Sequence, residues 1–427
     1  MASIEEIIRQ YAPECIVNGT LDLNLLKHRL SNHLPSNTPL ETGEMVLQEG
    51  AKDASHILYV GDNLPIMQHL APQMHSRCKC VYMDPPYNTG KQFLYTDRHS
   101  SIEQWLSWIA PRLTLAKDYL RADGIFLASI DDHAYAHLKV LCDRIFGMEN
   151  HITTFIWRRS GAGGLRKIFP ITTHEYILCY AKEKSIHKKP WHAPHSKDSM
   201  QAFRWKDEHG RYKKQALYHR TLSYRKAQHY PITLPDGRKA FPPPQKGAWR
   251  YIESRYLEEK AKGNICFVRS SRSPLRLEDG TPAPVNIYTK QYLIYGQSNP
   301  SSVLNPDLVG QTRTAKAELK EIFGSDVFLY AKPTKLLKHL FSLFPSKDED
   351  IFLDMFAGSA SAADAIYQLN PKLRSVSLQQ AETCPKQSSA QLAGFQTIAD
   401  LAWARINKRI PKDKARYHWT NIKKTSS

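Results

Sequence analysis

The chain of 427 residues, long enough for one large core or two ordinary domains, carries 59 lysines and arginines against 41 acidic residues, a formal net charge of +18. Its seven cysteines lack paired CxxC spacing, which argues against a disulfide framework or a zinc site, and we predict no metal. No uncharged apolar run reaches membrane-spanning length, and Glu5 and Glu6 stand where a secretory signal would be basic, so we expect a cytoplasmic protein with no membrane partner.

Residues 1–55 have a helix-like sequence with few core residues, and we predict that they form an N-terminal arm or a dimer contact. The apolar run at 57–60 precedes Asp62 and Asn63, which indicates a strand that turns into a short helix ending near Leu70. Asp62 or Asn63 is suited to cap that helix, and contact with a cofactor is the alternative for either residue.

The heptapeptide at 84–90, Asp-Pro-Pro-Tyr-Asn-Thr-Gly, follows the apolar run 81–83 and should leave the carboxyl end of a buried strand, where open α/β sheets place ligands. Its two prolines stiffen the loop and leave carbonyl acceptors. The Asp84 carboxylate and a prolyl carbonyl would hold both hydrogens of an exocyclic amino group and localise its lone pair, and Tyr87 offers a stacking face. Such a base must first leave the duplex. The predicted catalytic residues are Asp84, Pro85, Pro86 and Tyr87.

This heptapeptide, with Gly-Asp-Asn-Leu upstream at 61–64, resembles the S-adenosylmethionine-dependent DNA amino-methyltransferases, in particular the modification subunits of type III restriction systems. The resemblance implies a Rossmann-like class I methyltransferase sheet of the α/β class, interrupted by a target-recognition domain. It also implies methyl transfer to the N6 amine of a flipped adenine in double-stranded DNA. Cytosine N4 is the alternative, although Asp84 favours adenine because serine is commoner there in the cytosine enzymes. A glutamine-modifying protein methyltransferase is disfavoured, since its relatives resemble Asn-Pro-Pro-Tyr and lack a large basic insert.

Apolar residues from 102 to 120 repeat at helical spacing, which predicts an amphipathic helix. A second buried strand is predicted at 125–130. We expect Asp131 and Asp132 to cap the following helix, residues 133–145, and not to bind a metal, because methyl transfer to an amine needs none.

Two further strands are predicted at 152–157 and 176–180, and a basic, glycine-rich loop at 158–164 separates them. We expect this loop to follow the DNA backbone or to close over the flipped base. We interpret His174 as a packed strand-end residue and leave it out of the chemistry.

The composition changes near residue 183. Residues 183–290 hold 23 lysines and arginines and 10 acidic residues, a net charge of +13, with tryptophans and tyrosines among the cations. Such a segment suits a polyanionic partner through phosphate contact, base-edge readout and stacking, and a solvated basic surface is the alternative. We place the target-recognition domain here. We predict DNA contacts from Arg158, Arg159, Arg166, Lys167, Arg204, Lys213, Lys214, Arg225 and Arg250.

The pattern at 350–354 predicts a strand, followed by a small-residue turn at 355–362 and an apolar helix. A strand, such a turn and a helix N-terminus form the usual cradle for an adenosyl cofactor, and this turn resembles the family's Phe-x-Gly-x-Gly motif. Ala360 stands where the family usually has glycine, and a left-handed conformation there would cost about 1 kcal/mol or more. Weakened cofactor binding, or a non-catalytic DNA-binding subunit, is therefore an alternative.

Lys332 and Pro333 precede a helix-like segment at 336–343 and resemble the family's cofactor-side Lys-Pro motif, although Lys-Pro is also an ordinary helix start. A strand is expected at 375–378, and Glu382 beyond it is a candidate for the ribose hydroxyls. On the resemblance, the residues that contact S-adenosylmethionine are Asp62, Asn88, Lys332, Pro333, Asp354, Phe356, Gly358, Ser359 and Glu382.

The order of these motifs is that of the β group of amino-methyltransferases. The predicted domains are an arm (1–55), a catalytic half (56–182), a target-recognition domain (183–290), a cofactor-binding half (291–410) and a basic tail (411–427). Type III modification subunits are commonly longer, so the sequence leaves open both a stand-alone homodimer and a restriction subunit as partner.

Overall fold

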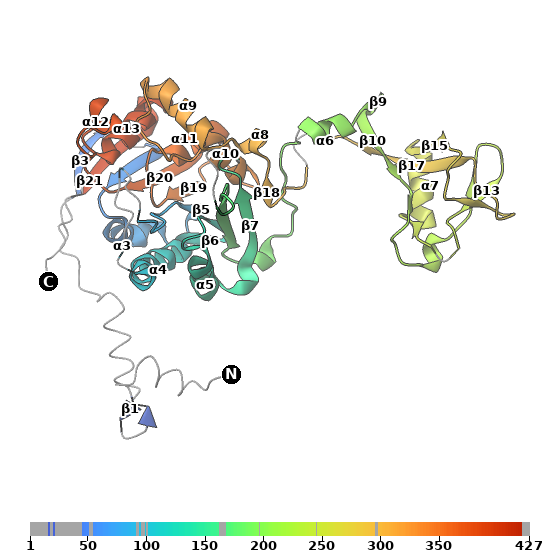
Figure 1. Cartoon of the computed structure of the whole chain (residues 1–427), viewed down its shortest axis with the longest axis horizontal. Helices are drawn as coiled ribbons and strands as arrows, with labels where there is room; N and C mark the ends of the chain where they lie inside the picture. The colour runs from blue at the N-terminus through green and yellow to red at the C-terminus, as the bar shows by residue number, and fades with distance from the viewer. Residues whose placement is uncertain are drawn as a thin grey trace. The chain divides into compact units, whose positions relative to one another are not determined.

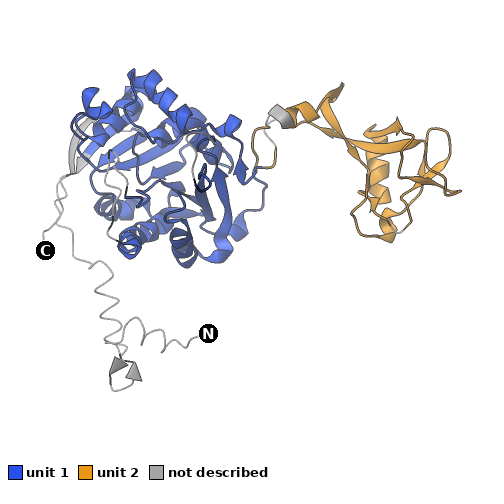
Figure 2. Cartoon of the chain, in the orientation of Figure 1, with its two compact units in different colours: residues 1–191, 300–427 blue, residues 192–299 orange. Residues whose placement is uncertain are grey.

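The computed structural model describes residues 16–17, 20–21, 45–50, 54–90, 94, 99, 101–161, 168–195, 197–244, 246–294 and 298–420. The chain divides into two compact units, a sheet unit (1–191 and 300–427) and an inserted unit (192–299) (Figure 2). The inserted unit overlaps the predicted recognition domain, with both boundaries nine residues further along the chain. Among the helices of the described residues, none is long and apolar enough to cross a membrane.

The sheet unit is built on one large mixed sheet. Its strands are β3 (Met45–Gly50), β4 (His56–Val60), β5 (Cys78–Met83), β6 (Leu120–Ile130), β7 (His151–Trp157), β8 (Glu175–Ala181), β18 (Val303–Leu304), β19 (Ile351–Asp354), β20 (Arg374–Gln379) and β21 (Ala415–Thr420). Within the described residues these ten strands take the order β18-β7-β8-β6-β5-β19-β20-β4-β21-β3. The run from β6 to β21 is parallel, whereas β8 and β3 are antiparallel to their neighbours. The predicted α/β class with a mixed sheet is confirmed.

Helices cover both faces of this sheet (Figure 1). One face carries α3 (Asn63–Met74), α4 (Ile102–Tyr119) and α5 (Tyr135–Phe146), and the other carries α10 (Thr334–Ser342), α11 (Ser361–Leu369) and α13 (Ile398–Arg409). The shorter connections include α8 (Pro306–Val309), α9 (Thr312–Phe323) and α12 (Ser389–Leu392). A parallel strand covered on both faces is mostly apolar, and all six residues of β5 are buried; the one charged residue among them, Lys79, pairs with Asp123 at 2.8 Å. Its two flanking strands, β19 and β6, come from opposite halves of the chain.

The sequence predictions were wrong at both ends of the sheet. The expected basic tail from residue 411 instead forms β21, which lies between β4 and β3. Its apolar residues Ala415 and Tyr417 pack into a buried cluster, and its backbone satisfies the open edge of β4. The end of the predicted arm forms β3; most of the arm lies outside the described residues, apart from β1 (Ile16–Val17), β2 (Thr20–Leu21) and β3.

The capping predictions had mixed outcomes. Asp62 caps α3, since its carboxylate accepts the Leu64 N–H at 3.0 Å, and the helix runs past Leu70 to Met74. Asp131 and Asp132 do not cap α5, which begins after Ala134 without a side-chain cap. A turn separates these aspartates from the helix, so Asp131 accepts the His133 N–H and Asp132 accepts the Tyr176 hydroxyl. The strand predicted at 125–130 starts earlier, at Leu120.

The inserted unit has its own core. An antiparallel sheet takes the order β15-β17-β10-β9. Buried Trp249, Tyr230 and Tyr256 form the centre of a separate apolar cluster. Its elements are α6 (Lys197–Ala202), β9 (Trp205–Asp207), β10 (Gly210–Ala216), β11 (Tyr218–His219), β12 (Ile232–Thr233), β13 (Lys239–Phe241), β14 (Ala248–Trp249), α7 (Glu253–Ala261), β15 (Ile265–Arg269), β16 (Arg276–Leu277) and β17 (Val285–Tyr292). Aromatic residues that the sequence assigned to DNA recognition therefore include structural core residues.

Candidate active site

A cavity of about 560 Å³ lies at the carboxyl ends of β4, β5, β19 and β20 in the sheet unit. Its volume is within the usual range for a small-molecule site. The parallel pairing of β5 with β19 brings the turns after these two strands together, and the Met355 N–H donates to the Tyr82 carbonyl at 3.0 Å. Of the residues predicted for the site, the cavity wall includes Asp62, Asp84, Pro85, Pro86, Tyr87, Arg159, Lys332, Asp354, Phe356, Gly358, Ser359 and Glu382.

The polar centre of the cavity consists of Asp84, Tyr87, Glu175 and Lys332. Lys332 Nζ lies 2.8 Å from Asp84 Oδ1, 2.8 Å from the Tyr87 hydroxyl and 3.4 Å from Glu175 Oε2. The Tyr87 hydroxyl lies 2.9 Å from Asp84 Oδ1 and 3.2 Å from Glu175 Oε2, and its single proton is donated to one of them at a time. Lys332 therefore lies against the predicted catalytic loop and fixes one oxygen of Asp84.

The charge states of this centre follow from its partners. Burial lowers the pKa of Lys332, but the carboxylates of Asp84 and Glu175 raise it by more, so that the ammonium group is held in its charged form. Burial, and then the negative charges of Asp84 and Glu175, raise the pKa of the Tyr87 hydroxyl well above its ordinary value. Tyr87 is thus a neutral hydroxyl that donates a hydrogen bond, and Lys332 is the cation that offsets the two carboxylates.

The loop that carries Asp84 is held from behind by a buried tryptophan. Trp105 Nε1 donates to the Pro86 carbonyl at 2.9 Å, whereas no hydrogen bond of the described residues uses the Pro85 carbonyl, which makes it the more available prolyl acceptor for a substrate. Asn88 has φ +59°, and its side chain accepts the His99 N–H at 2.7 Å. Asparagine tolerates this left-handed conformation better than most residues.

Neither Asn88 nor Pro333, both predicted to contact the cofactor, is part of the cavity wall.

The turn after β19 forms the other side of the cavity. Burial raises the pKa of Asp354 to about 7; the Phe356 N–H, which Asp354 accepts at 3.2 Å, opposes this shift and the charge of Asp84 adds to it. Gly358 has φ +53°, and its N–H donates to Gln379 Oε1 at 2.7 Å. A Cβ at Gly358 would lie 3.6 Å from the Phe328 ring, so the positive φ and not crowding accounts for glycine there.

Ala360 adopts the conformation that the sequence could not decide. Its φ of 57° and ψ of 34° are left-handed, and its side chain is fully buried. The substitution of alanine for the family's glycine therefore strains this turn by about 1 kcal/mol, but the chain still forms the cradle. The turn from Phe356 to Ser359 lines the cavity and is mostly made of small residues; together with the acidic Asp354 and a cavity of ligand size, it fits an adenosyl cofactor.

Asp62 and Asn63 connect the turn after β4 to the turn after β19. Arg112 Nη2 donates to Asp62 Oδ1 at 2.8 Å and Arg112 Nε to Asn63 Oδ1 at 2.6 Å. Asn63 Nδ2 in turn donates to the Met355 carbonyl at 2.9 Å. Asp62 is thus both a helix cap and a wall residue, and the two interpretations of this residue are compatible.

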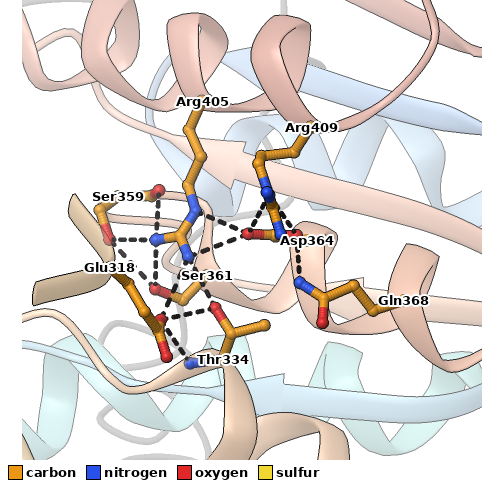
Figure 3. A network of polar contacts seen from close by, with 8 residues as sticks. All are labelled: Glu318, Thr334, Ser359, Ser361, Asp364, Gln368, Arg405 and Arg409. Atoms are coloured by element: carbon orange, nitrogen blue, oxygen red, sulfur yellow. Dashed lines mark hydrogen bonds and ion pairs between the residues drawn. The ribbon is translucent and has the colours of Figure 1, made fainter. Parts of the chain in front are cut away.

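A second polar network joins the end of the cofactor turn to the start of α10 (Figure 3). Arg405 is 1% exposed, and its guanidinium donates to Thr334 Oγ1 at 2.7 Å, Ser361 Oγ at 2.9 Å and Asp364 Oδ2 at 3.1 Å. Arg405 therefore ties the start of α10, two residues after Lys332, to the start of α11, which follows the cofactor turn. Glu318 lies 3.6 Å from the same guanidinium.

Sequence reasoning missed Glu175, Arg112, Trp105 and Arg405. Glu175 begins β8 and Arg405 lies within α13, and a single charged residue in such an element has no spacing pattern that marks it.

The predicted DNA-binding residues fall into separate places. Arg159 is on the cavity wall, 3.6 Å from Glu175, and Arg158 beside it is exposed. Arg166 and Lys167 lie outside the described residues. In the inserted unit, Arg204 and Lys214 lie over the Trp205 ring at 4.5 and 4.8 Å, and Lys213 lies over Phe203 at 5.1 Å. Elsewhere in that unit Arg225 is exposed, and Arg250 Nε donates to the Ala216 carbonyl.

Over most of its length the chain is similar to known DNA-modifying proteins. A protein-family model described as DNA methylase matches residues 78–380. The chain is 28% identical to the Mod subunit of the type III restriction-modification enzyme EcoP15I from Escherichia coli, over 90% of this chain and 68% of that protein. It is 27% identical to the type II methyltransferase M.KpnI from Klebsiella pneumoniae, over 91% of this chain and 95% of that protein. Among solved structures, the cytosine-N4-specific PvuII DNA methyltransferase aligns with 12% identity and a TM-score of 0.38, over 85% of this chain and 97% of that one.

Proposed function

The chain belongs to the DNA methylase family, and from that premise we propose that it transfers a methyl group from S-adenosylmethionine to the N6 amine of an adenine flipped out of double-stranded DNA. The observation that carries the proposal is the position of Asp84 and the Pro85 carbonyl, which share one cavity with the turn from Asp354 to Ser359. The amine acceptors and the cradle for the methyl donor thus lie side by side.

The residues around Asp84 would hold the amine in a reactive state. Among the contacts of the described residues, Lys332 and Tyr87 both use Oδ1 of Asp84, which leaves Oδ2 to accept one amino hydrogen. The Pro85 carbonyl would accept the other, because Trp105 occupies the Pro86 carbonyl. With both hydrogens held, the nitrogen lone pair would be localised out of the plane of the base instead of delocalised into the ring, and it could attack a methyl group held on the cofactor side of the cavity. After transfer the nitrogen must lose one proton, and Oδ2 of Asp84 is the nearest acceptor for it.

Tyr87 would position the base ring. Lys332 Nζ lies 5.0 Å from the centre of the Tyr87 ring, so the ammonium group contacts the aromatic ring as well as the hydroxyl oxygen. Because the Tyr87 hydroxyl is bonded to the acidic centre, the ring has a fixed orientation when the base arrives. Positioning of this kind, with water removed, supplies much of the rate in such a reaction.

The cofactor turn would hold the methyl donor. When bound, S-adenosylmethionine supplies a methyl group on a positively charged sulfur, which takes the bonding pair as the amine attacks. Asp354, Phe356, Gly358 and Ser359 lie on the wall that would contact it, and Glu382, on the same wall, is the candidate for the ribose hydroxyls. Asn88 and Pro333 would act indirectly, by shaping the loops that carry Tyr87 and Lys332.

Cytosine N4 is the second candidate substrate, because its amine presents the same two hydrogens and the same delocalised lone pair. Asp84 favours adenine on the family resemblance. The strained Ala360 is the observation in favour of a non-catalytic DNA-binding subunit, and the formed cavity is the observation against it. A homodimer, a restriction subunit as partner and a cytoplasmic location stay predictions.

The test is incorporation of labelled methyl from S-adenosylmethionine into unmethylated bacterial DNA, with the product nucleosides separated. We expect N6-methyladenine. N4-methylcytosine would contradict the assigned base but not the chemistry of Asp84. No incorporation together with no cofactor binding would contradict the enzyme assignment.

A further inference from the structure

Four consecutive apolar residues are exposed on the connection between β7 and β8. Ile168 is 93% exposed, Phe169 78% and Ile171 44%, and Pro170 between them is also exposed. Single exposed apolar side chains are ordinary on protein surfaces, but a contiguous exposed run usually marks a contact surface. We call residues 168–171 the apolar tip.

The two ends of this connection, residues 157–160 and 173–175, form a stem that starts at the wall of the active-site cavity. Trp157 ends β7 and Glu175 begins β8; the two residues pair across the strands, and both are on the cavity wall. The pairing continues outward, since the Ser160 N–H donates to the Thr173 carbonyl at 3.2 Å. The apolar tip is therefore attached to the cavity rim through a hydrogen-bonded stem.

The stem is basic where the tip is apolar. Arg158 is exposed on the outgoing side, and Arg159 follows it with an ion pair to Glu175 at 3.6 Å. The arginines of the stem suit the phosphates on the outside of a DNA duplex. The uncharged apolar tip suits the stacked bases inside it. Pro170 restricts the backbone of the tip, which lowers the entropy lost when it is fixed in a contact.

We propose that the apolar tip inserts into the base stack of the duplex and fills the space that the target base leaves when it enters the cavity. The inference rests on the proposed function, because it assumes a flipped base. Apolar side chains such as isoleucine, phenylalanine and proline serve as wedges between base steps in other DNA-binding proteins, where they offset part of the cost of unstacking. The tip would therefore stabilise the flipped state and take no part in the methyl transfer itself.

The experiment compares two DNA duplexes that carry the site methylated by the wild-type protein. In one, the target base is paired normally; in the other, it lies opposite an abasic position, so that extrusion costs less. Single-turnover methyl transfer is measured for the wild type and for the double variant Ile168→Ala/Phe169→Ala. Met148→Ala is the matched control, because Met148 is 74% exposed but precedes β7 at the strand end away from the cavity.

We expect the double variant to lose about tenfold or more of the rate on the paired duplex and to recover to within about twofold of the wild type on the abasic duplex. Met148→Ala should match the wild type on both. An unchanged rate on the paired duplex, or an equal loss on both duplexes, would overturn the wedge while leaving the proposed function intact. A wild-type protein that methylates neither duplex nor genomic DNA would overturn the proposed function and the wedge with it.

Discussion

Lys332 Nζ lies 2.8 Å from Asp84 Oδ1, although 248 positions of the chain separate the two residues. Lys332 precedes α10, and Phe341 of that helix packs on Tyr82 of β5 and Phe352 of β19, which brings the start of α10 to the loop after β5, while the inserted unit lies in the chain between them. The ammonium group also contacts Tyr87 and Glu175, so a residue that the family resemblance assigns to the cofactor side organises the side that would hold the base.

Replacement of Lys332 by methionine should lower kcat about a hundredfold, because Asp84 loses the donor that fixes Oδ1 and two carboxylates are left beside each other. The measurement is steady-state methyl transfer with both substrates varied. Lys335→Met, an exposed lysine on the first turn of α10, is the control and should behave as the wild type. If kcat is unchanged and only the KM for S-adenosylmethionine rises, Lys332 acts on the cofactor and this account of the centre is wrong.

Asp84→Ala should reduce methyl transfer by about a thousandfold or more while DNA affinity stays unchanged, because the carboxylate acts on the amine and not on the duplex. In Asp84→Asn the amide oxygen should stay on the Lys332 and Tyr87 donors, which puts the NH2 group where Oδ2 would accept the amine, so this variant should be about as inactive as alanine. Transfer rates and filter binding to the same DNA separate the two effects. Retained transfer in Asp84→Ala would refute the assigned mechanism.

Much of the fold was predictable because buried parallel strands are continuous apolar runs, and the strands at 81–83 and 350–354 gave the position of both loops. Their convergence followed from the rule that the carboxyl ends of parallel strands share one edge. The partners Glu175 and Arg405 were not predictable, since single charges in regular elements show no periodicity. Strand β21 was missed because its alternation of Ala415, Tyr417 and Trp419 with polar residues spans only six positions of a basic segment, and the open edge of β4 is what shows its place.

The backbone angle at residue 360 also could not be derived, because either sign of φ is compatible with alanine. With the left-handed conformation known, Ala360→Gly should relieve about 1 kcal/mol of strain but lose a buried methyl group of similar value. We expect the Tm and the affinity for S-adenosylmethionine to stay near those of the wild type. Ala360→Val should destabilise the protein by about 2 kcal/mol or more, since a β-branched residue is a poor fit at positive φ. A tenfold or greater gain in cofactor affinity on Ala360→Gly would instead show that alanine impairs the site.

Asp354 should make folding stability depend on pH. Its folded pKa of about 7 lies above the ordinary value of 3.8, so between those values the folded state holds a proton that the unfolded state has lost. Its contribution to stability is therefore complete below about pH 4, falls as the pH rises to 7 and is gone above that, a difference on the order of 4 kcal/mol. Asp354→Asn cannot titrate, so the difference in unfolding free energy between wild type and variant should change with this sign from pH 4.5 to 8. A constant difference would contradict the raised pKa.

Arg405 and Arg409 both bind Asp364, yet their replacement should have different consequences. Arg405→Met leaves Asp364 with one fewer partner in a buried site and frees Thr334 and Ser361, so we expect a loss of about 3–5 kcal/mol in unfolding free energy. Arg409, whose side chain is 41% exposed, should contribute only about 0–1 kcal/mol. Denaturant unfolding of both variants measures these losses.

The milder variants Arg405→Lys and Arg409→Lys should stay folded, so their KM for S-adenosylmethionine can be compared. Because the Arg405 guanidinium joins α10, which follows Lys332, to α11, which follows the cofactor turn, this KM should rise in Arg405→Lys and not in Arg409→Lys. If substitutions at Arg405 and Arg409 changed the unfolding free energy and the KM equally, Arg405 would contribute no more than an ordinary surface ion pair.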